Sequence, residues 1–214
     1  MMGPMQRDPA VLIPAAGAGR RFGRDKAAAR VRGVRNLDRI ARTLRAVGLE
    51  RPLVVTGARA EEHRRVRWAE PLRWTVHAGW CRGRTSSLQH GLRRLAHASA
   101  VLIWPVDLPL VREDTLRALL DAWRERPEAW LVQVTHEGRA GHPFLLHHRL
   151  AARLRELGAD ESPRPLLRRV GDEHRLRIPV ADPAIHADMD EPRDRFELER
   201  LVRTRRLVKL ATPA

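Results

Sequence analysis

This sequence of 214 residues contains no tyrosine, one cysteine and only two lysines. The single cysteine, Cys81, excludes an internal disulfide and a zinc site built from several cysteines, which argues against an oxidised secreted scaffold and a zinc finger. The longest apolar runs, such as residues 101–106, fall far short of the ~20 residues that span a membrane. We therefore expect a cytoplasmic protein without a signal segment and without a membrane partner.

Positive charge, in contrast, is abundant. The chain has 41 basic and 26 acidic residues and a formal net charge of +15, which is typical of proteins that bind polyanions. However, only Lys26 and Lys209 are lysines, and arginine is spread along the whole chain among many alanines. That skew also fits codon composition, so we expect no specific nucleic-acid partner. An anionic small substrate would suit the charge equally well.

The pattern of short apolar runs predicts an α/β fold. Apolar strands, beginning at residues 10–13 and including 53–56, 74–77 and 101–106, alternate with helical segments, which is typical of a parallel sheet covered by helices. Further strands are expected at 130–135 and 176–180, and a final helix at 192–207. Residues 140–143 look like a functional loop. We expect one domain over residues 10–207, disorder over 1–9 and a tail over 208–214.

The segment after the first strand is the most informative part of the chain. Small residues there let backbone N–H groups approach an anion, and Arg21 and Lys26 add positive charge. The glycine spacing does not match the dinucleotide fingerprint, and Lys26 lacks the neighbours that a P-loop requires. A flexible turn with basic residues is the alternative, but one of only two lysines lies here. We predict a phosphate-binding loop whose backbone contacts come from Ala15, Ala16, Gly17, Ala18 and Gly19.

At this point the sequence resembles the molybdenum cofactor nucleotidyltransferases, the MobA-like NTP transferase family. Their first motif reads Leu-Ala-Ala-Gly-x-Ser/Gly-x-Arg-Met-Gly-x-x-Lys, and residues 14–26 match it except for Pro14 and Phe22. Four later segments are similar to the family's Ser-Ser-Leu, Asp-Met-Pro-Leu-Val, Gly-His-Pro and Asp-Ile-Asp-Thr-Pro motifs, in the same order. These segments lie at residues 80–88, 106–111, 141–143 and 188–192.

The resemblance implies a fold, a reaction and several site residues. The fold would be a three-layer α/β/α, Rossmann-like nucleotidyltransferase domain with a mostly parallel sheet. Ala16 is similar to the cytidylyltransferase branch, so the implied reaction transfers CMP from CTP to the phosphate of molybdopterin or molybdenum cofactor, with Mg²⁺ as cofactor and pyrophosphate as product. Gly141 and His142 would contact the acceptor, although a histidine without a role is the alternative. A molybdenum hydroxylase is a possible partner of the product.

The residues themselves fit that chemistry. Asp107 follows a buried strand, at the edge where open α/β sheets bind ligands, and carboxylates are ordinary Mg²⁺ ligands. Asp188 or Asp190 would supply a second carboxylate, with capping of the last helix as the alternative, especially for Asp190. Ser86 and Ser87 are expected at a helix start, either contacting the nucleotide or serving as N-caps. Catalysis would rest on Lys26, Arg21 and Asp107 through charge stabilisation.

Other functions remain open at the level of the sequence. An isoprenoid cytidylyltransferase shares Pro-Ala-Ala-Gly but carries Asp-Ala-Ala-Arg-Pro where this chain has Val106-Asp107-Leu108-Pro109. A guanylyltransferase or sugar-phosphate nucleotidyltransferase on the same fold is disfavoured by Ala16 alone. A non-catalytic chaperone for cofactor insertion, or an idle paralogue, is the alternative from another class. Val106, where the family has glycine, favours this non-catalytic alternative, whereas the presence of Lys26 and Asp107 argues for an active enzyme.

Overall fold

The computed structural model describes residues 8–158 and 160–211, with the side chains of 204–211 left out of the description. The disorder expected at the N-terminus therefore falls mainly on residues 1–7, outside the described residues, as does the predicted tail beyond residue 211. The described strands form a seven-stranded sheet and a two-stranded hairpin. The sheet contains β1 (Ala10–Ala15), β4 (Leu53–Thr56), β5 (Arg73–Val76), β6 (Ala100–Ile103), β7 (Leu131–His136), β8 (Arg139–His147) and β9 (Arg175–Pro179); the hairpin is β2 (Arg30–Val31) with β3 (Val34–Arg35).

The strand order in the sheet is β5-β4-β1-β6-β8-β7-β9, with β1 near the middle. Strand β1 pairs in parallel with β4 and β6, and β4 pairs in parallel with β5. Strand β8 alone runs the other way, antiparallel to both β6 and β7, while β7 and β9 are parallel. The predicted mostly parallel sheet is thus confirmed, and it places the carboxyl ends of β1, β4 and β6 at one edge.

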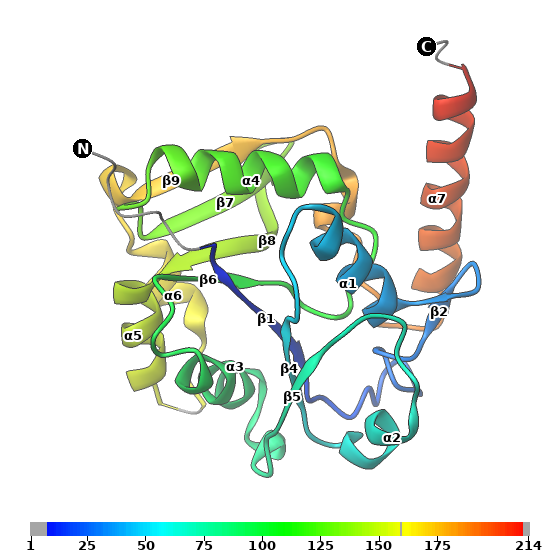
Figure 1. The fold of residues 1–214 in the computed structure, drawn as a ribbon, viewed down its shortest axis with the longest axis horizontal. Helices are drawn as coiled ribbons and strands as arrows, with labels where there is room; N and C mark the ends of the chain where they lie inside the picture. Colours follow the sequence, from blue (N-terminus) through cyan, green and yellow to red (C-terminus); the bar gives the residue numbers. More distant parts are fainter. Residues whose placement is uncertain (1–7, 159, 212–214) are drawn as a thin grey trace.

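Helices cover both faces of this sheet, which gives the three predicted layers (Figure 1). Alternation along β1 explains the two faces: Val11 and Ile13 pack into the core under α1 and α4, whereas Leu12 packs under α3 and α5. The helices α1, α3, α4 and α5 bury apolar residues against the sheet. The helices are α1 (Asn36–Ala46), α2 (Ala60–Arg65), α3 (Arg84–Arg94), α4 (Glu113–Glu125), α5 (His148–Glu156), α6 (Pro163–Arg168) and α7 (Asp194–Ala211).

Three segments differ from the sequence prediction. Residues 140–143 are part of strand β8 and do not form the expected loop. The run 101–106 ends as a strand at Ile103, because a turn containing Pro105 follows, although the N–H of Trp104 still donates to the Leu12 carbonyl at 3.0 Å. Residues 208–211, which we assigned to a tail, continue helix α7. The hairpin β2–β3 and helix α6 are not anticipated by the sequence pattern.

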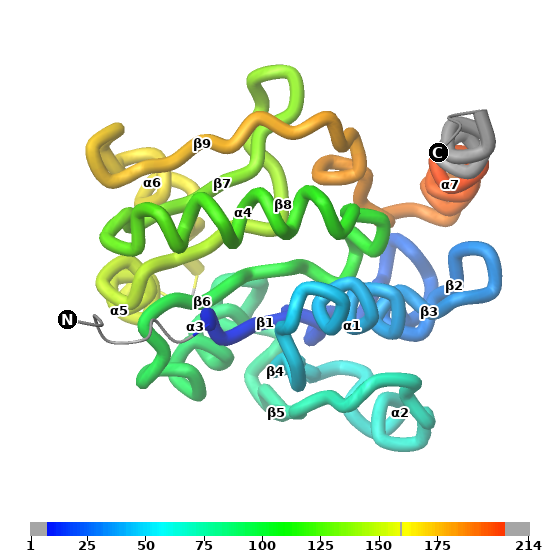
Figure 2. The backbone as a smooth tube through the Cα atoms, turned by 45° about the horizontal axis from the view of Figure 1, so that its top comes forward, coloured from blue at the N-terminus to red at the C-terminus, as the bar shows by residue number. Residues whose placement is uncertain are grey.

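Helix α7 lies beside the β2–β3 hairpin in both views (Figures 1 and 2) and extends away from the sheet in Figure 1. A small third core lies where its first turns meet the body of the protein. This core brings the C-terminal segment against the loop that follows β1, and its buried members are Phe22, Val31, Leu110, Ala184, Met189 and Leu198. Among the described helices, none has the length and apolar character needed to cross a membrane.

Candidate active site

The loop after β1 has free space next to the backbone of Gly17. A Cβ placed on Gly17 would meet nothing within 4 Å, so space remains next to this backbone. Gly19 has φ +63°, and a Cβ there would collide with the Arg24 carbonyl, so a larger residue would distort the turn. The N–H of Gly23 donates to the Gly19 carbonyl at 2.8 Å and closes the loop. The result is a tight turn with accessible backbone, as an anion-binding loop requires.

Lys26 joins the two acidic segments of the site. Its Nζ lies 2.5 Å from Oδ1 of Asp190 and 3.3 Å from Oδ2 of Asp107. Arg21 contacts the other carboxylate oxygen of Asp190 at 2.8 Å. The Lys26 side chain is only 16% exposed. Three segments that lie far apart in the sequence therefore meet at one ammonium group, at the carboxyl ends of β1 and β6.

The segment 188–190 is anchored by its middle residue. Met189 is fully buried, and its backbone N–H donates to the carbonyl of Asp107 at 2.9 Å. Because neighbouring side chains in extended backbone project to different sides, burying Met189 leaves Asp188 and Asp190 outside the core. The capping alternative for Asp190 is wrong, since its carboxylate binds Lys26 and Arg21, while Asp194 accepts the N–H groups of Asp190 and Glu191 at 2.7 and 2.6 Å.

The carboxylates of the site have unequal acidities. The hydrogen bond from Lys26 lowers the pKa of Asp190 from its ordinary value, against an opposing effect of burial. Partial burial raises the pKa of Asp188, and the negative charges of Asp190 and Asp107 raise it further. Three carboxylates, Asp107, Asp188 and Asp190, thus lie among the cationic side chains of Lys26, Arg21 and Arg84.

This arrangement fits a divalent cation. The described residues contain no group of three or more His, Cys, Asp or Glu side chains placed to hold a metal by themselves. Mg²⁺, however, is usually held by one or two carboxylates together with substrate phosphates and waters, so a complete protein cage is not needed. Asp107 and Asp190 already share one cation, the Lys26 ammonium, and the negative charge of Asp188 favours a second. The donor set is therefore compatible with the predicted metal.

Ser86 and Ser87 lie in the first turn of α3, as predicted, but they are not N-caps. Gly83 occupies the N-cap position, and both hydroxyls donate to its carbonyl, at 2.9 and 3.2 Å. The ring of His77, which follows β5, is 3.1 Å from the Ser86 hydroxyl. The N-cap alternative for the two serines is therefore wrong, and both residues are buried in the first turn of the helix.

Gly141 and His142 lie on β8 rather than on a loop. A Cβ on Gly141 would come within 2.7 Å of Ile185, so the strand packs too closely against the C-terminal segment for a larger residue. His142 is half-buried, and burial lowers its pKa to about 4, although the charge of Asp107 works in the opposite direction. His142 is therefore neutral near pH 7, and it lies close enough to Asp107 for the charge of that residue to affect its pKa.

Asn36 is a site residue that the sequence did not indicate. Its amide Nδ2 donates to the Lys26 carbonyl at 2.9 Å and also approaches the Met189 sulfur at 3.5 Å. The side chain is fully buried at the first residue of α1. A polar residue just before the apolar positions of a helix is ordinarily an exposed helix start, so the pattern gives no sign of this burial.

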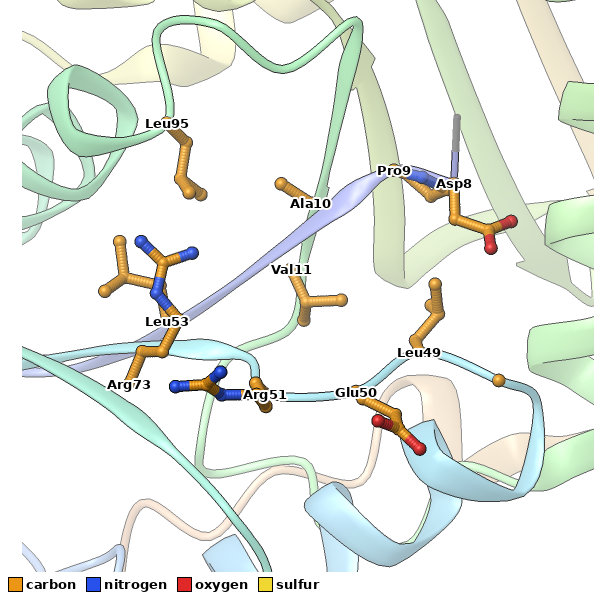
Figure 3. Close-up of a pocket in the computed structure, with 11 residues that line it drawn as sticks. Asp8, Pro9, Ala10, Val11, Leu49, Glu50, Arg51, Leu53, Arg73 and Leu95 are labelled. Carbon is orange, nitrogen blue, oxygen red and sulfur yellow. The ribbon is translucent and has the colours of Figure 1, made fainter. Parts of the chain in front are cut away.

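A separate pocket lies at the opposite edge of the sheet (Figure 3). It is formed at the amino ends of β1 and β4, and the charged residues that line it are Asp8, Glu50, Arg51 and Arg73. None of the residues predicted for the active site lines it. Open α/β sheets bind ligands at the carboxyl ends of their strands, so the Lys26 region is the better candidate.

The fold and this site together define a nucleotidyltransferase-type α/β domain, and comparisons with known proteins agree. The model of the MobA-like NTP transferase domain matches residues 11–176. The chain belongs to this family, and the resemblance inferred from its motifs is confirmed. Among curated proteins, no sequence matches the chain significantly.

Solved structures show the same fold at low sequence identity. A nucleotidyl transferase from Methanothermobacter has a TM-score of 0.76 and 20% identity, covering 92% of this chain and 99% of its own. Rv0371c from Mycobacterium tuberculosis, solved in complex with manganese, has a TM-score of 0.72 and 21% identity, with 91% and 99% covered. The molybdopterin-guanine dinucleotide biosynthesis protein A from Archaeoglobus fulgidus has a TM-score of 0.66 and 18% identity, with 91% and 99% covered.

Proposed function

We propose that this protein transfers CMP from CTP to the terminal phosphate of molybdopterin or its molybdenum form. The observation that carries the proposal is the meeting of Lys26, Asp107 and Asp190 beside the open small-residue loop after β1. A cation bridging two carboxylates next to accessible backbone N–H groups is an arrangement suited to a metal-bound triphosphate. Ala16 in the first motif supports cytidine over guanosine, through the resemblance to the cytidylyltransferase branch.

The reaction needs no covalent enzyme intermediate. A phosphate oxygen of the acceptor attacks the α-phosphorus of CTP, the bond between the α-phosphorus and the bridging oxygen breaks, and pyrophosphate leaves with that oxygen. Lys26, Arg21 and the loop N–H groups would stabilise the negative charge that grows on the transferring and leaving phosphates. Bound Mg²⁺, held by Asp107 and Asp190 with Asp188 nearby, would neutralise phosphate charge and orient the triphosphate.

Other residues would bind and orient the two substrates. The charge of Arg84, the first residue of α3, acts on Asp190, so the first turn with Ser86 and Ser87 lies near the carboxylates of the site and supports nucleotide binding there, because helix N-termini favour anions. Gly141 and the neutral His142 lie on β8 near Asp107 and would contact the acceptor. Delivery of the product to a molybdenum hydroxylase and a cytoplasmic location belong to the same proposal.

Thermal unfolding with CTP, GTP, ATP and UTP, each with and without Mg²⁺, tests the nucleotide. A ligand at 100 times its Kd stabilises the folded protein by about 2.7 kcal/mol. We expect a rise in Tm with CTP that requires Mg²⁺ and disappears in Asp107→Asn. A larger rise with GTP would assign the protein to the guanylyl branch, and no rise with any nucleotide would contradict the proposal.

A further inference from the structure

A chain of hydrogen bonds leads from strand β4 to the loop that carries Lys26. Thr56, the last residue of β4, places its hydroxyl 2.7 Å from Nδ1 of His63 on α2. Nε2 of His63 is 3.1 Å from each carboxylate oxygen of Asp25, the residue before Lys26. The proposed reaction uses neither Thr56 nor His63. These two buried polar residues therefore need another explanation.

His63 is held in an unusually apolar place for an imidazole. The residue is 2% exposed, and its ring lies against Trp68 and Trp74 at centroid distances of 5.9 and 5.3 Å. The indole N–H of Trp68 donates to the His63 carbonyl at 3.0 Å, which fixes the backbone as well. Leucine or phenylalanine would fill such a space at lower desolvation cost, so the two ring nitrogens are the feature to explain.

Asp25 links the His63 ring to the turn that carries Lys26. Its carboxylate accepts the backbone N–H groups of Ala27 and Ala28 at 2.9 and 3.3 Å, and so braces the turn at Lys26. Burial opposes ionisation of Asp25, but the hydrogen bonds from His63 and from the backbone N–H groups of Ala27 and Ala28 together outweigh it, and the pKa of Asp25 is lowered from its ordinary value. An ionised carboxylate is the better acceptor for these N–H groups.

The Lys26 backbone is thereby held from two sides. Asp25 braces the peptide groups that follow Lys26, and the buried amide of Asn36 donates to the Lys26 carbonyl at 2.9 Å. With its backbone fixed, Lys26 can place Nζ between Asp107 and Asp190 with little loss of freedom. A charge that stabilises a transition state must be placed to within about 1 Å, because larger errors cost on the order of a hundredfold in rate.

We propose that His63 is a positioning residue for Lys26: its Nε2–H donates to Asp25 while Nδ1 accepts the Thr56 hydroxyl, and this bridge sets the loop geometry that catalysis requires. The inference rests on the proposed nucleotidyl transfer. His63 touches neither nucleotide nor acceptor in this account. It acts only through Asp25 and the turn at Lys26.

Kinetics of two His63 variants test the bridge. His63→Leu keeps the contact with the two tryptophans and removes both ring hydrogen bonds, whereas His63→Gln retains an amide donor that can reach Asp25. We expect His63→Leu to lower kcat by about tenfold to a hundredfold, with KM for CTP changed by less than about threefold. His63→Gln should recover most of that loss. Equal kcat values for His63→Leu and the unchanged protein, or no recovery in His63→Gln, would overturn the proposal.

His90→Leu is the matched control. His90 also pairs with a strand threonine, since its Nε2 lies 2.8 Å from the hydroxyl of Thr75 on β5, and its ring lies against His77, but within the described part of the chain none of its contacts reaches Asp25. We expect kcat of this variant to stay within about twofold of the unchanged protein, whatever its effect on Tm. A fall as large as that of His63→Leu would show that loss of any such histidine lowers the rate, and would contradict a specific role for His63.

A second measurement works even if no nucleotide is turned over. The chain contains only two lysines, Lys26 and Lys209, so protein with ¹³C-labelled lysine gives two Cε signals, which Lys209→Arg assigns. We expect His63→Leu to move or broaden the Lys26 signal and His90→Leu to leave it unchanged. A shifted signal without any turnover would support the bridge and contradict the proposed function. An unchanged signal in folded His63→Leu would overturn the bridge while the function stands.

Thr56→Val provides a milder variant in case His63→Leu does not fold. Valine keeps the shape and the strand preference of threonine but removes the hydroxyl that pairs with Nδ1. We expect the same direction of change in kcat and in the Lys26 signal, with a smaller size. Unchanged values in a folded Thr56→Val protein would contradict the proposed part of Thr56 in the bridge.

Discussion

Lys26 is the residue on which most of the site converges. Its ammonium contacts Asp107 and Asp190, its carbonyl accepts the Asn36 amide, and its turn is braced by Asp25. A lysine is a compact point charge on a flexible stem, so it can exchange a carboxylate for a phosphate oxygen when a triphosphate arrives. The site therefore has one mobile charge on a rigid backbone.

Lys26→Met and Asp107→Asn should each lower kcat by about two to three orders of magnitude, because each removes a charge that stabilises the transferring phosphates. The folded protein should persist, since both side chains lie partly in solvent at the sheet edge. Pyrophosphate release and thermal unfolding measure the two effects. Arg124→Ala, which removes one positive charge from the exposed side of α4, should leave kcat unchanged. Activity near the normal level in both site variants would contradict the assignment.

The lowered pKa of His142 predicts that the free energy of unfolding depends on pH. Burial lowers its pKa to about 4 in the folded state, whereas an unfolded histidine titrates near 6.5. Below pH 6.5 the unfolded state binds the proton first, so stability is present above that pH and falls as the pH drops towards 4. Urea unfolding should show a shallower fall for His142→Gln, by up to ~1.4 kcal/mol per pH unit. The exposed His97→Gln should match the unchanged protein, and identical slopes for all three proteins would contradict the prediction.

At the scale of elements, the close contact of α3 with the sheet depends on Gly91. A Cβ at this position would come within 2.8 Å of both Leu12 on β1 and Val55 on β4. The helix therefore lies directly on the two strands whose carboxyl ends carry the loop and Thr56. This contact also fixes the first turn of α3, with Ser86 and Ser87, relative to the β1 loop.

Gly91→Ala should destabilise the protein by about 1–3 kcal/mol through overpacking, although alanine is the better helix former. Chemical denaturation measures the change. Gly17→Ala is the matched control, since a Cβ there meets open space and should leave stability nearly unchanged while weakening CTP binding at the loop. Equal stability of the two variants would contradict the packing argument.

The sequence predicts the strands that have a clear run of strand-forming residues, and it misses strands in which glycine or proline interrupts that run. The run at 53–56 is a strand with the predicted bounds, because continuous apolar residues mark a buried parallel strand. The run at 74–77 is a strand within a residue of the prediction, although this edge strand buries only Thr75. Strand β8 is missed, since Gly141 and Pro143 are ordinarily loop residues. Both lie where the β7–β8 register shifts, between the pairs Gln133↔Phe144 and Thr135↔Ala140, and such a bulge tolerates a proline.

The same limit applies to the site. Residues that carry charge in a short motif, such as Lys26 and Asp107, can be named from the sequence and lie together in the structure. Asn36 and His63 cannot be named, because their importance comes from burial and from partners distant in the sequence. Only the fold brings Asp190 to Lys26, across 164 positions of the chain.

At the scale of the whole molecule, the net charge is +15, but basic residues on the helices alternate with acidic ones. Arg64 pairs with Glu61 on α2, and Arg117 pairs with Glu113 on α4, each within one helical turn. A nucleic-acid surface instead needs basic residues gathered on one face. We expect DNA binding to be weak, independent of sequence and lost with modest salt, as measured by fluorescence anisotropy. Sequence-selective binding that survives 150 mM salt, roughly physiological strength, would contradict this expectation.

The most direct test of the central claim is product formation. The protein is incubated with molybdopterin, Mg²⁺ and each of the four nucleoside triphosphates in turn, and mass spectrometry identifies any dinucleotide. The account predicts a cytosine dinucleotide of molybdopterin, formed together with pyrophosphate, and formed about two to three orders of magnitude more slowly with Lys26→Met. A dinucleotide from GTP in preference to CTP, or none from any nucleotide, would contradict it.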